Sequence, residues 1–350
     1  MRKTLRTGAP LLLLSVSLLV SGCGLGGSKT GSELDPPKVN YVKEGKSLDK
    51  KDKTAAKSAQ TQRRQLFLFD SNGMVVPQVL ALPKNDETAK QVLEYLVKDG
   101  PVSNMIPNGF QAVLPADTEV LSVNINKGTA TANFSKEFTE YKPQDELKIL
   151  QAITFTLTQF DNIKKVKIQI DGKNQNSMPV NNTPIGEGVS RVDGINIENG
   201  NVADITNSNL VTLYFLAQTN DQTYYVPVTR RVAREGTDKV TATVENLIVG
   251  PSAQSKLLTD FRTDVKLLST PVVNKDGVAT LNFNSALLDN KEENRIADEV
   301  LNSIVLSLTE LPEVKKVAIQ VNGKSKIFNE KGKELTAPVS RPKEVNTGEF

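Results

Sequence analysis

The sequence has no histidine, no tryptophan and a single cysteine, Cys23, and aromatic residues make up only 5% of its 350 positions. Without histidine, a Ser-His-Asp triad, a Cys-His pair and an imidazole ligand set for zinc are all excluded. One cysteine allows neither an intramolecular disulfide nor a thiolate cluster. Carboxylate chemistry, Ser/Lys chemistry or a function without catalysis remains. Apolar residues still reach 38%, which is enough for a folded core, and the length fits two ordinary domains.

Positive charge is concentrated near the N-terminus. Of the 43 basic and 40 acidic residues, 13 basic but only five acidic ones lie in positions 1–64, so the remainder of the chain carries net negative charge. A basic surface on a folded domain is the usual sign of nucleic-acid binding. The charge distribution therefore argues against a nucleic-acid partner.

The N-terminus has the pattern of a secretory signal. Three basic residues precede an apolar run over residues 11–20, which is short for a membrane span, although an uncleaved membrane anchor is the alternative. Residues 19–23, LVSGC, resemble the bacterial lipobox, in which the cysteine receives a diacylglyceryl group before the chain is cleaved ahead of it. We therefore expect a lipoprotein signal peptide over 1–22, cleavage between Gly22 and Cys23, and lipidation of Cys23.

The segment 23–64 is expected to be a lipidated flexible tether. Glycine, serine, proline, lysine and aspartate dominate it, and such a composition cannot bury enough apolar surface to order itself. Two acyl chains hold a protein on a bilayer where one chain would be marginal. We therefore expect the mature chain to be anchored through Cys23 to the extracytoplasmic face of a membrane, with a tether of roughly 35 Å r.m.s. length.

Beyond residue 64 the sequence repeats itself at an offset near 150 residues. The blocks recur in one order, and each unit is large enough to bury its own core, so we expect two tandem domains at 65–206 and 207–350. The repeated blocks are Gly-Pro at 100–101 and 250–251, Gly-x-Ala-x-x-Asn-Phe at 128–134 and 277–283, V-x-I-x-[IV]-[DN]-G-K at 166–173 and 317–324, and Val-Ser-Arg at 189–191 and 339–341.

Each unit predicts the order βαββαβ, an α+β fold with helices on one face of a small, largely antiparallel sheet. Alternation over residues 121–125 would point Leu121, Val123 and Ile125 into the core. First strands are predicted at 66–69 and 211–215, helices at 86–97, 144–160, 237–249 and 291–310, and last strands from 166 and 317.

Residues 323–325, Gly-Lys-Ser, look like the end of a phosphate-binding loop. That loop needs a glycine five residues before its last glycine, and position 318 is alanine. A turn with positive φ fits better, both here at Asn322-Gly323 and at the matching Asp171-Gly172. The segment is therefore predicted to be a turn.

Two acidic pairs, Asp145-Glu146 and Glu292-Glu293, contain the carboxylates that a glycosidase would need. Both pairs are predicted to open helices, where negative charge interacts favourably with the helix dipole, so a capping role is favoured. The cluster at Arg230, Arg231 and Arg234 could meet an acidic partner, but a solvated surface is favoured. No catalytic, cofactor-binding or metal-binding residue is predicted.

The LVSGC segment, the charged spacer and two units that carry these motifs resemble the GerM spore-germination and sporulation lipoproteins, which have two tandem GerMN domains. The resemblance extends over residues 19–350, and the first unit adds a Leu-Pro at Leu114-Pro115 that the second lacks. It implies a fold related to the ring-building motif, no enzyme activity and no cofactor.

The resemblance also implies a function. The protein would be an interaction or assembly component of the envelope complex between mother cell and forespore, needed for efficient germination. Its partners would be extracellular sporulation assembly proteins in the intermembrane space around the forespore. Two alternatives remain open: a lipoprotein that binds cell wall or a small ligand, and a carboxylate-based wall hydrolase.

Overall fold

The computed structural model describes residues 60–198, 206–219, 222–234, 236 and 238–346. The described residues cluster into one compact unit. The expected signal peptide and most of the expected tether lie outside the described residues. The first strand begins at Thr61, four residues before the expected start of the first unit. Residues 61–64 have polar side chains and gave no strand signal, but their backbone pairs with residues 80–83.

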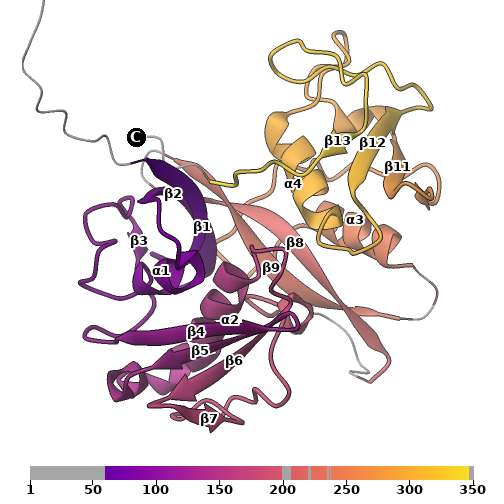
Figure 1. The fold of residues 1–350 in the computed structure, drawn as a ribbon. Helices are drawn as coiled ribbons and strands as arrows, with labels where there is room; N and C mark the ends of the chain where they lie inside the picture. Colours follow the sequence, from indigo (N-terminus) through magenta and orange to yellow (C-terminus); the bar gives the residue numbers. More distant parts are fainter. Residues whose placement is uncertain (1–59, 199–205, 220–221, 235, 237, 347–350) are drawn as a thin grey trace, which may run out of the picture. The chain divides into compact units, whose positions relative to one another are not determined.

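The first repeat has two small sheets (Figure 1). One sheet is an antiparallel hairpin with a short third strand, in the order β2-β1-β3; the other has the order β4-β5-β6-β7, in which only β5 and β6 run parallel. The strands are β1 (Thr61–Asp70), β2 (Val75–Pro83), β3 (Phe110–Gln111), β4 (Val120–Asn126), β5 (Thr129–Phe134), β6 (Lys165–Ile170) and β7 (Lys173–Gln175). The helices are α1 (Thr88–Glu94) and α2 (Glu146–Leu157), with 3-10 turns at Lys136–Thr139, Pro143–Asp145 and Arg191–Asp193.

The second repeat follows the same plan. Its hairpin is β8 (Ser208–Gln218) and β9 (Thr223–Ala233), and its second sheet has the order β10-β11-β12-β13, with β11 and β12 parallel. That sheet contains β10 (Val272–Val273), β11 (Val278–Phe283), β12 (Lys316–Val321) and β13 (Val339–Ser340). The helices are α3 (Lys239–Val249) and α4 (Asp298–Leu308), and a 3-10 turn covers Ser285–Leu287.

The predicted α+β class with tandem repeated units is confirmed. The position of the first strand of each unit, however, differs from the prediction. It was expected in one sheet with the other strands, but it pairs in a separate hairpin. Helix α2 contacts β1 and β2 of the hairpin as well as β6 of the second sheet. Residues 149–157 of α2 are accordingly all buried, since a helix covered on several sides has no polar face.

Buried hydroxyl groups on these helices have a structural task in both repeats. Thr156 Oγ1 accepts a hydrogen bond from the amide of Phe67 in β1 at 3.0 Å. Ser307 Oγ accepts one from the amide of Tyr214 in β8 at 2.8 Å. Each hydroxyl thus satisfies a strand amide that would otherwise be buried without a partner, a costly state.

The repeated motifs are explained by the turn that follows β6 and β12. The Asn133 side chain accepts a hydrogen bond from the amide of Gly172, and the Asn282 side chain accepts one from the amide of Gly323, both at 2.9 Å. The motif asparagine on one strand therefore holds the turn at the end of its parallel neighbour. This contact links two motifs that are about 40 residues apart in each repeat.

Two local predictions fail. The helix expected over 291–310 begins only at Asp298, because residues 291–294 form a turn and Asn294 has a φ of 51°, which a helix cannot accommodate. In β4, Val123 packs against the core as expected, but a bulge between Val120 and Ser122 buries Val120 and leaves Leu121 41% exposed. Ile125, near the end of the strand, is 42% exposed.

Each repeat has its own hydrophobic core, and the two cores meet at β2. Val75 packs in the core of the first repeat, whereas the next residue, Val76, packs in the core of the second. Alternate side chains of one strand therefore serve two cores. Strand β2 accordingly contacts β9 of the second hairpin.

Candidate functional site

Gly22 and Cys23, the expected cleavage and lipidation positions, lie outside the described residues. The expected turns are present: φ is 51° at Asn322 and 75° at Gly323, and the matching Asp171 and Gly172 have 47° and 76°. Lys324 is exposed beyond this turn. The turn interpretation of the Gly-Lys-Ser segment is confirmed.

Glu146, from the first predicted acidic pair, is fully buried at the start of α2. Its carboxylate accepts hydrogen bonds from the backbone amides of Val180, Asn181 and Thr183 at 2.7 to 2.9 Å, and from the Tyr141 hydroxyl at 2.9 Å. Burial alone would raise the pKa of Glu146, but these backbone hydrogen bonds outweigh it and hold the pKa below its ordinary value. The carboxylate therefore fixes the 180–183 loop to the helix rather than facing a substrate.

Glu292 and Glu293, from the second acidic pair, lie in the turn before α4 and not at its first residue. Their backbone amides donate to Asn290 Oδ1 at 3.0 and 3.1 Å, and Glu293 forms an exposed ion pair with Arg295 at 2.9 Å. The helix-opening carboxylates are instead those of Asp298 and Glu299. The two acidic pairs are thus not equivalent in structure.

The arginine cluster in β9 is not a uniformly solvated surface, because Arg230 is only 8% exposed. Its guanidinium donates to Glu198 Oε2 at 2.9 Å and to the carbonyl of Gly250, the residue that caps α3, at 3.0 Å. A cation at the C-terminal end of a helix is electrostatically favourable. The prediction of a solvated Arg230 is therefore wrong, since its partners lie far away in sequence.

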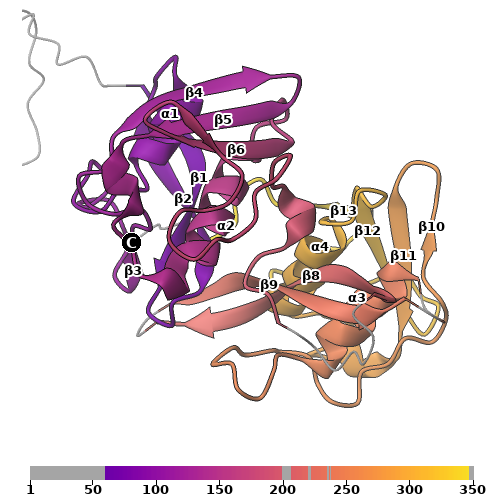
Figure 2. The same ribbon diagram turned by 90° about the horizontal axis from the view of Figure 1, so that it is seen from below.

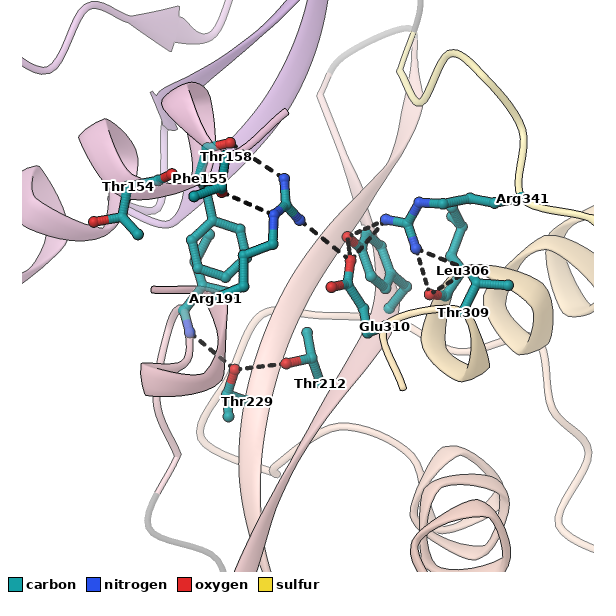
Figure 3. Close-up of polar contacts among 12 residues, drawn as sticks. Thr154, Phe155, Thr158, Arg191, Thr212, Thr229, Leu306, Thr309, Glu310 and Arg341 are labelled. Carbon is teal, nitrogen blue, oxygen red and sulfur yellow. Dashed lines mark hydrogen bonds and ion pairs between the residues drawn. The ribbon is translucent and has the colours of Figure 1, made fainter. Parts of the chain in front are cut away.

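The two Val-Ser-Arg blocks place equivalent arginines next to one carboxylate (Figure 3). Arg341 donates to Glu310 Oε1 at 2.7 Å and to the hydroxyl of Tyr214 at 2.7 Å. Arg191, from the first repeat, lies 3.5 Å from the same Glu310 oxygen. Glu310 therefore joins the two repeats through an ion pair with each.

Both arginines are also fixed within their own repeats. Arg191 donates to Thr158 Oγ1 at 2.9 Å and lies 4.6 Å from the ring centroid of Phe155. Arg341 makes the equivalent bond to Thr309 Oγ1 at 2.9 Å. The sequence analysis noted these arginines only as part of the repeated Val-Ser-Arg block. Because both follow the last predicted strand of their repeat, they could have been predicted to occupy equivalent positions.

Glu310, Arg191, Arg341 and Tyr214 form part of the junction between the two repeats, and the charges there shift the pKa of Glu310. Burial would raise the pKa of its carboxyl, but the charges of Arg341 and Arg191 outweigh burial and lower it below the ordinary value. Burial and the neighbouring Glu310 charge raise the pKa of Tyr214. At neutral pH the junction therefore contains an ionised glutamate, a neutral phenol and two guanidinium groups.

Two asparagines connect the repeats reciprocally. The Asn196 side chain pairs with both the amide and the carbonyl of Val75 in β2, and it also donates to the carbonyl of Pro227 in β9 at 2.8 Å. The Asn346 side chain pairs with the amide and carbonyl of Tyr225 in β9. It donates in turn to the carbonyl of Pro77 in β2 at 2.9 Å. All three pairs of equivalent positions are 150 residues apart.

This exchange is the pattern of an isologous interface, in which residue i of one half contacts j of the other and j contacts i. Both asparagines have positive φ, 47° and 56°, a conformation that asparagine tolerates better than most residues. Asn196 is itself buried, so it forms an internal link between the two repeats.

The side chains of Asn196, Asn346, Glu310 and Glu146 thus form their hydrogen bonds with backbone groups, hydroxyl groups and guanidinium groups of the protein itself. Among the described residues, no group of three or more His, Cys, Asp or Glu side chains is arranged to hold a metal ion. Within the same ranges, no helix combines the length and apolar character that crossing a bilayer requires. Chemically, the arrangement holds two repeats together.

Comparison with known proteins identifies the family. The sequence family Germane, described as sporulation and spore germination, matches residues 65–176 and 212–327. The chain is 51% identical over 356 aligned residues to the spore germination protein GerM of Bacillus subtilis (strain 168), and the match covers 96% of each. The chain belongs to the GerM family.

A solved structure supports the same assignment for the fold. The tandem GerMN domains of the sporulation protein GerM from Bacillus subtilis match with a TM-score of 0.77 and 54% sequence identity, over 82% of this chain and 99% of that one. The expected resemblance to the GerM family, with two tandem domains, is therefore confirmed. As a member of the GerM family, the protein functions in sporulation and spore germination.

Proposed function

We propose that this GerM-family protein is a non-enzymatic, membrane-anchored lipoprotein that acts as an interaction and assembly component of the mother cell–forespore envelope complex. In this role it would be needed for efficient germination. The observation that supports the proposal best is the junction, where Asn196, Asn346 and Glu310 fix two repeats to each other. Two rigidly linked units present a fixed pair of surfaces to partners, which suits assembly.

The anchor in this proposal is Cys23, lipidated after cleavage behind Gly22, on the extracytoplasmic face of the membrane. Residues 23–60 would link the anchor to β1. The partners would be other extracellular sporulation assembly proteins, in the intermembrane space around the forespore. Fixing one end at the membrane raises the effective concentration of the repeats there without high intrinsic affinity.

The anchor is tested by metabolic labelling with a palmitate analogue in the full chain. Wild type should incorporate the label and fractionate with membranes, whereas Cys23→Ala should remain uncleaved and unlabelled. A Ser21→Ala variant, which keeps a small residue beside the cleavage site, is the matched control and should behave as wild type. Absence of label in the wild-type protein would refute lipid anchoring.

The assembly role is tested by imaging a fluorescent fusion of the full chain in sporulating cells, beside a germination assay. We expect the fusion to concentrate at the membranes around the forespore and to co-purify with envelope proteins after mild cross-linking. Zymography of the same purified protein should show no wall hydrolysis. Diffuse localisation with normal germination, or hydrolysis of wall material, would contradict the proposal.

A cleft in the first repeat supports the alternative, binding of cell wall or a small ligand. It has a volume of about 480 Å³, and its lining includes Lys98, Lys142 and Asp145. This volume falls in the range of small-molecule sites, and the mixed charges would suit a zwitterionic group. A rise in melting temperature with muropeptides, lost in a Lys98→Ala/Lys142→Ala variant, would favour the alternative, because a ligand of the native state stabilises it.

A further inference from the structure

Strand β4 is the outer strand of the second sheet in the first repeat, and among the described strands its only partner is β5. Figure 2 shows it at the border of that sheet, with β5 and then β6 below it in this view. Its sequence, Val-Leu-Ser-Val-Asn-Ile-Asn, contains no charged residue and no proline. Proteins protect a free edge with charges, prolines, short strands, bulges or a covering element. Strand β4 has no charge and no proline, its bulge is confined to Val120–Ser122, and α1 contacts it, so the part of the edge without a bulge is 123–126.

A groove runs beside this strand. It has a volume of about 440 Å³, and β4 lines it from Leu121 to Ile125, opposite the residues that begin α1. Leu121 and Ile125 are 41% and 42% exposed, although both are large aliphatic side chains. The groove therefore places apolar surface next to unpaired strand backbone.

The Ile125 end of the groove carries a positive charge. Ile125 pairs with Ala130, which pairs with Val166 at the start of β6, so Phe160 and Asn162 in the preceding loop reach this end. The guanidinium of Arg64 lies 5.6 Å from the ring centroid of Phe160.

Arg64 has no carboxylate partner in the described part of the chain. Its terminal nitrogens donate to Gln62 Oε1 and to the carbonyl of Arg63, and its Nε is buried without any hydrogen-bond partner. Asp86 and Glu87 also line the groove, but both are exposed and neither forms an ion pair with Arg64. The buried Nε cannot reach an incoming group, but each terminal nitrogen has a second N–H that can donate to a carboxylate.

The equivalent edge of the second repeat is closed to such an addition. There β10 has only two residues and follows Pro271, and four residues separate its start from the isolated bridge that Leu267 makes to Phe283. Val272 pairs with Thr280 as Asn124 of β4 pairs with Thr131, so these two positions are equivalent. Among the described strands, the outer strand of this sheet is therefore seven residues long in the first repeat and two residues long in the second.

We propose that this groove binds an extended segment of a partner protein, which adds to β4 as a further strand. The segment would be about six residues long, with aliphatic side chains at alternate positions that pack on Leu121 and Ile125, and a carboxylate that pairs with Arg64. Main-chain hydrogen bonds would provide affinity, and the carboxylate would fix the register. The inference rests on the assembly role proposed above and assigns it a site.

The test places a photo-cross-linking amino acid at position 124 of the full chain in sporulating cells, with the equivalent position 272 as the matched control. We expect a discrete cross-linked partner at position 124 and not at 272. The cross-linked peptide, identified by mass spectrometry, should alternate aliphatic and polar residues and contain an acidic residue near one end.

The charge pair is tested in the same cells. Arg64→Glu should lower the cross-linking yield about tenfold, and replacement of the partner's acidic residue by lysine should restore it. Arg64→Gln should give an intermediate yield, and Ile125→Ser should lower the yield at unchanged melting temperature. A matched Val272→Ser variant should have no effect.

Several results would overturn the inference: equal yields at 124 and 272, cross-links to a second copy of this chain or to wall polymer, or no rescue by the charge swap. If the partner cross-links at 272 instead, the assembly role stands and the groove is the wrong site. If neither position cross-links and the fusion does not concentrate around the forespore, the assembly role itself fails.

Discussion

The two repeats differ in an informative way at the second residue after α2 in the first repeat and after α4 in the second. In the first repeat this residue is Gln159, whose amide bonds the amide and the carbonyl of Gln65 within the same repeat. In the second repeat it is Glu310, which forms ion pairs with Arg341 of its own repeat and with Arg191 of the first repeat. The same position therefore makes contacts within the repeat in the first copy and a contact between the repeats in the second.

This difference shows how a duplicated unit becomes half of a pair. The asparagine contacts are reciprocal, since Asn196 and Asn346 each reach the proline carbonyl of the opposite hairpin. The charged contact is not reciprocal, because only the second copy has a carboxylate. The junction thus combines a symmetric frame with an asymmetric ion pair, and the two components can be broken separately.

The largest effect is expected from Glu146→Ala, which changes only the first repeat. The substitution would leave the amides of the 180–183 loop and the Tyr141 hydroxyl buried without their acceptor, so we expect a loss of about 4 kcal/mol in the free energy of unfolding. Urea denaturation measures it. Asp145→Ala, one residue earlier and only partly buried, is the control and should cost less than about 1 kcal/mol. Equal losses would show that the buried carboxylate has no special role.

Glu310→Ala should follow, at about 3 kcal/mol, because it leaves two partly buried guanidinium groups without their shared carboxylate. Gln159→Ala is the equivalent change in the first repeat and should cost only about 1 kcal/mol, since it removes neutral hydrogen bonds. The two values come from the same urea experiment. A loss at Gln159 as large as that at Glu310 would contradict the asymmetry described above.

Asn196→Gly and Asn346→Gly should each cost about 2 kcal/mol, because each leaves backbone groups of both hairpins, β1-β2 and β8-β9, unpaired. The alanine variants should each cost about 1 kcal/mol more, because alanine tolerates positive φ poorly. Asn294→Gly is the control, since Asn294 also has positive φ but lies in an exposed turn. If the losses in unfolding free energy for Asn196→Gly and Asn346→Gly differ by much more than the experimental error, the two asparagines do not contribute equally to the junction, although their contacts are equivalent.

These contacts mark the limit of what the sequence could predict. The turns at Asp171 and Asn322 were predictable because Asp-Gly and Asn-Gly favour positive φ locally, although the asparagine that holds each turn lies about 40 residues away. The bulge that exposes Leu121, and the roles of Asn196 and Glu310, were not, because they depend on partners far away in sequence. Periodicity gave the elements and most of the core, but it contains no information on which side chains meet between repeats.

Acid should weaken the asymmetric contact. The pKa of Glu310 in the folded chain lies below its ordinary value of about 4.3, so its ion pairs stabilise the fold at neutral pH and are lost as pH falls through the folded pKa. The difference in unfolding free energy between wild type and Glu310→Gln should stay constant from pH 8 to 6 and shrink by about 1 to 2 kcal/mol below pH 4. Urea denaturation at each pH measures it. A difference that persists unchanged at pH 3 would rule out the charged form as its source.

The smallest effect is expected from Glu292→Ala/Glu293→Ala, the acidic pair in the turn before α4. Glu293 is exposed and paired only at the surface, and the turn amides keep their bonds to Asn290, so the loss should stay within about 0.5 kcal/mol. Because α4 begins at Asp298, circular dichroism should show no change in helix content. Germination of the variant should also be normal, since these carboxylates build no site. If the variant kept its fold and abundance but lost function, the carboxylates would have a chemical role, and the non-enzymatic proposal would fail.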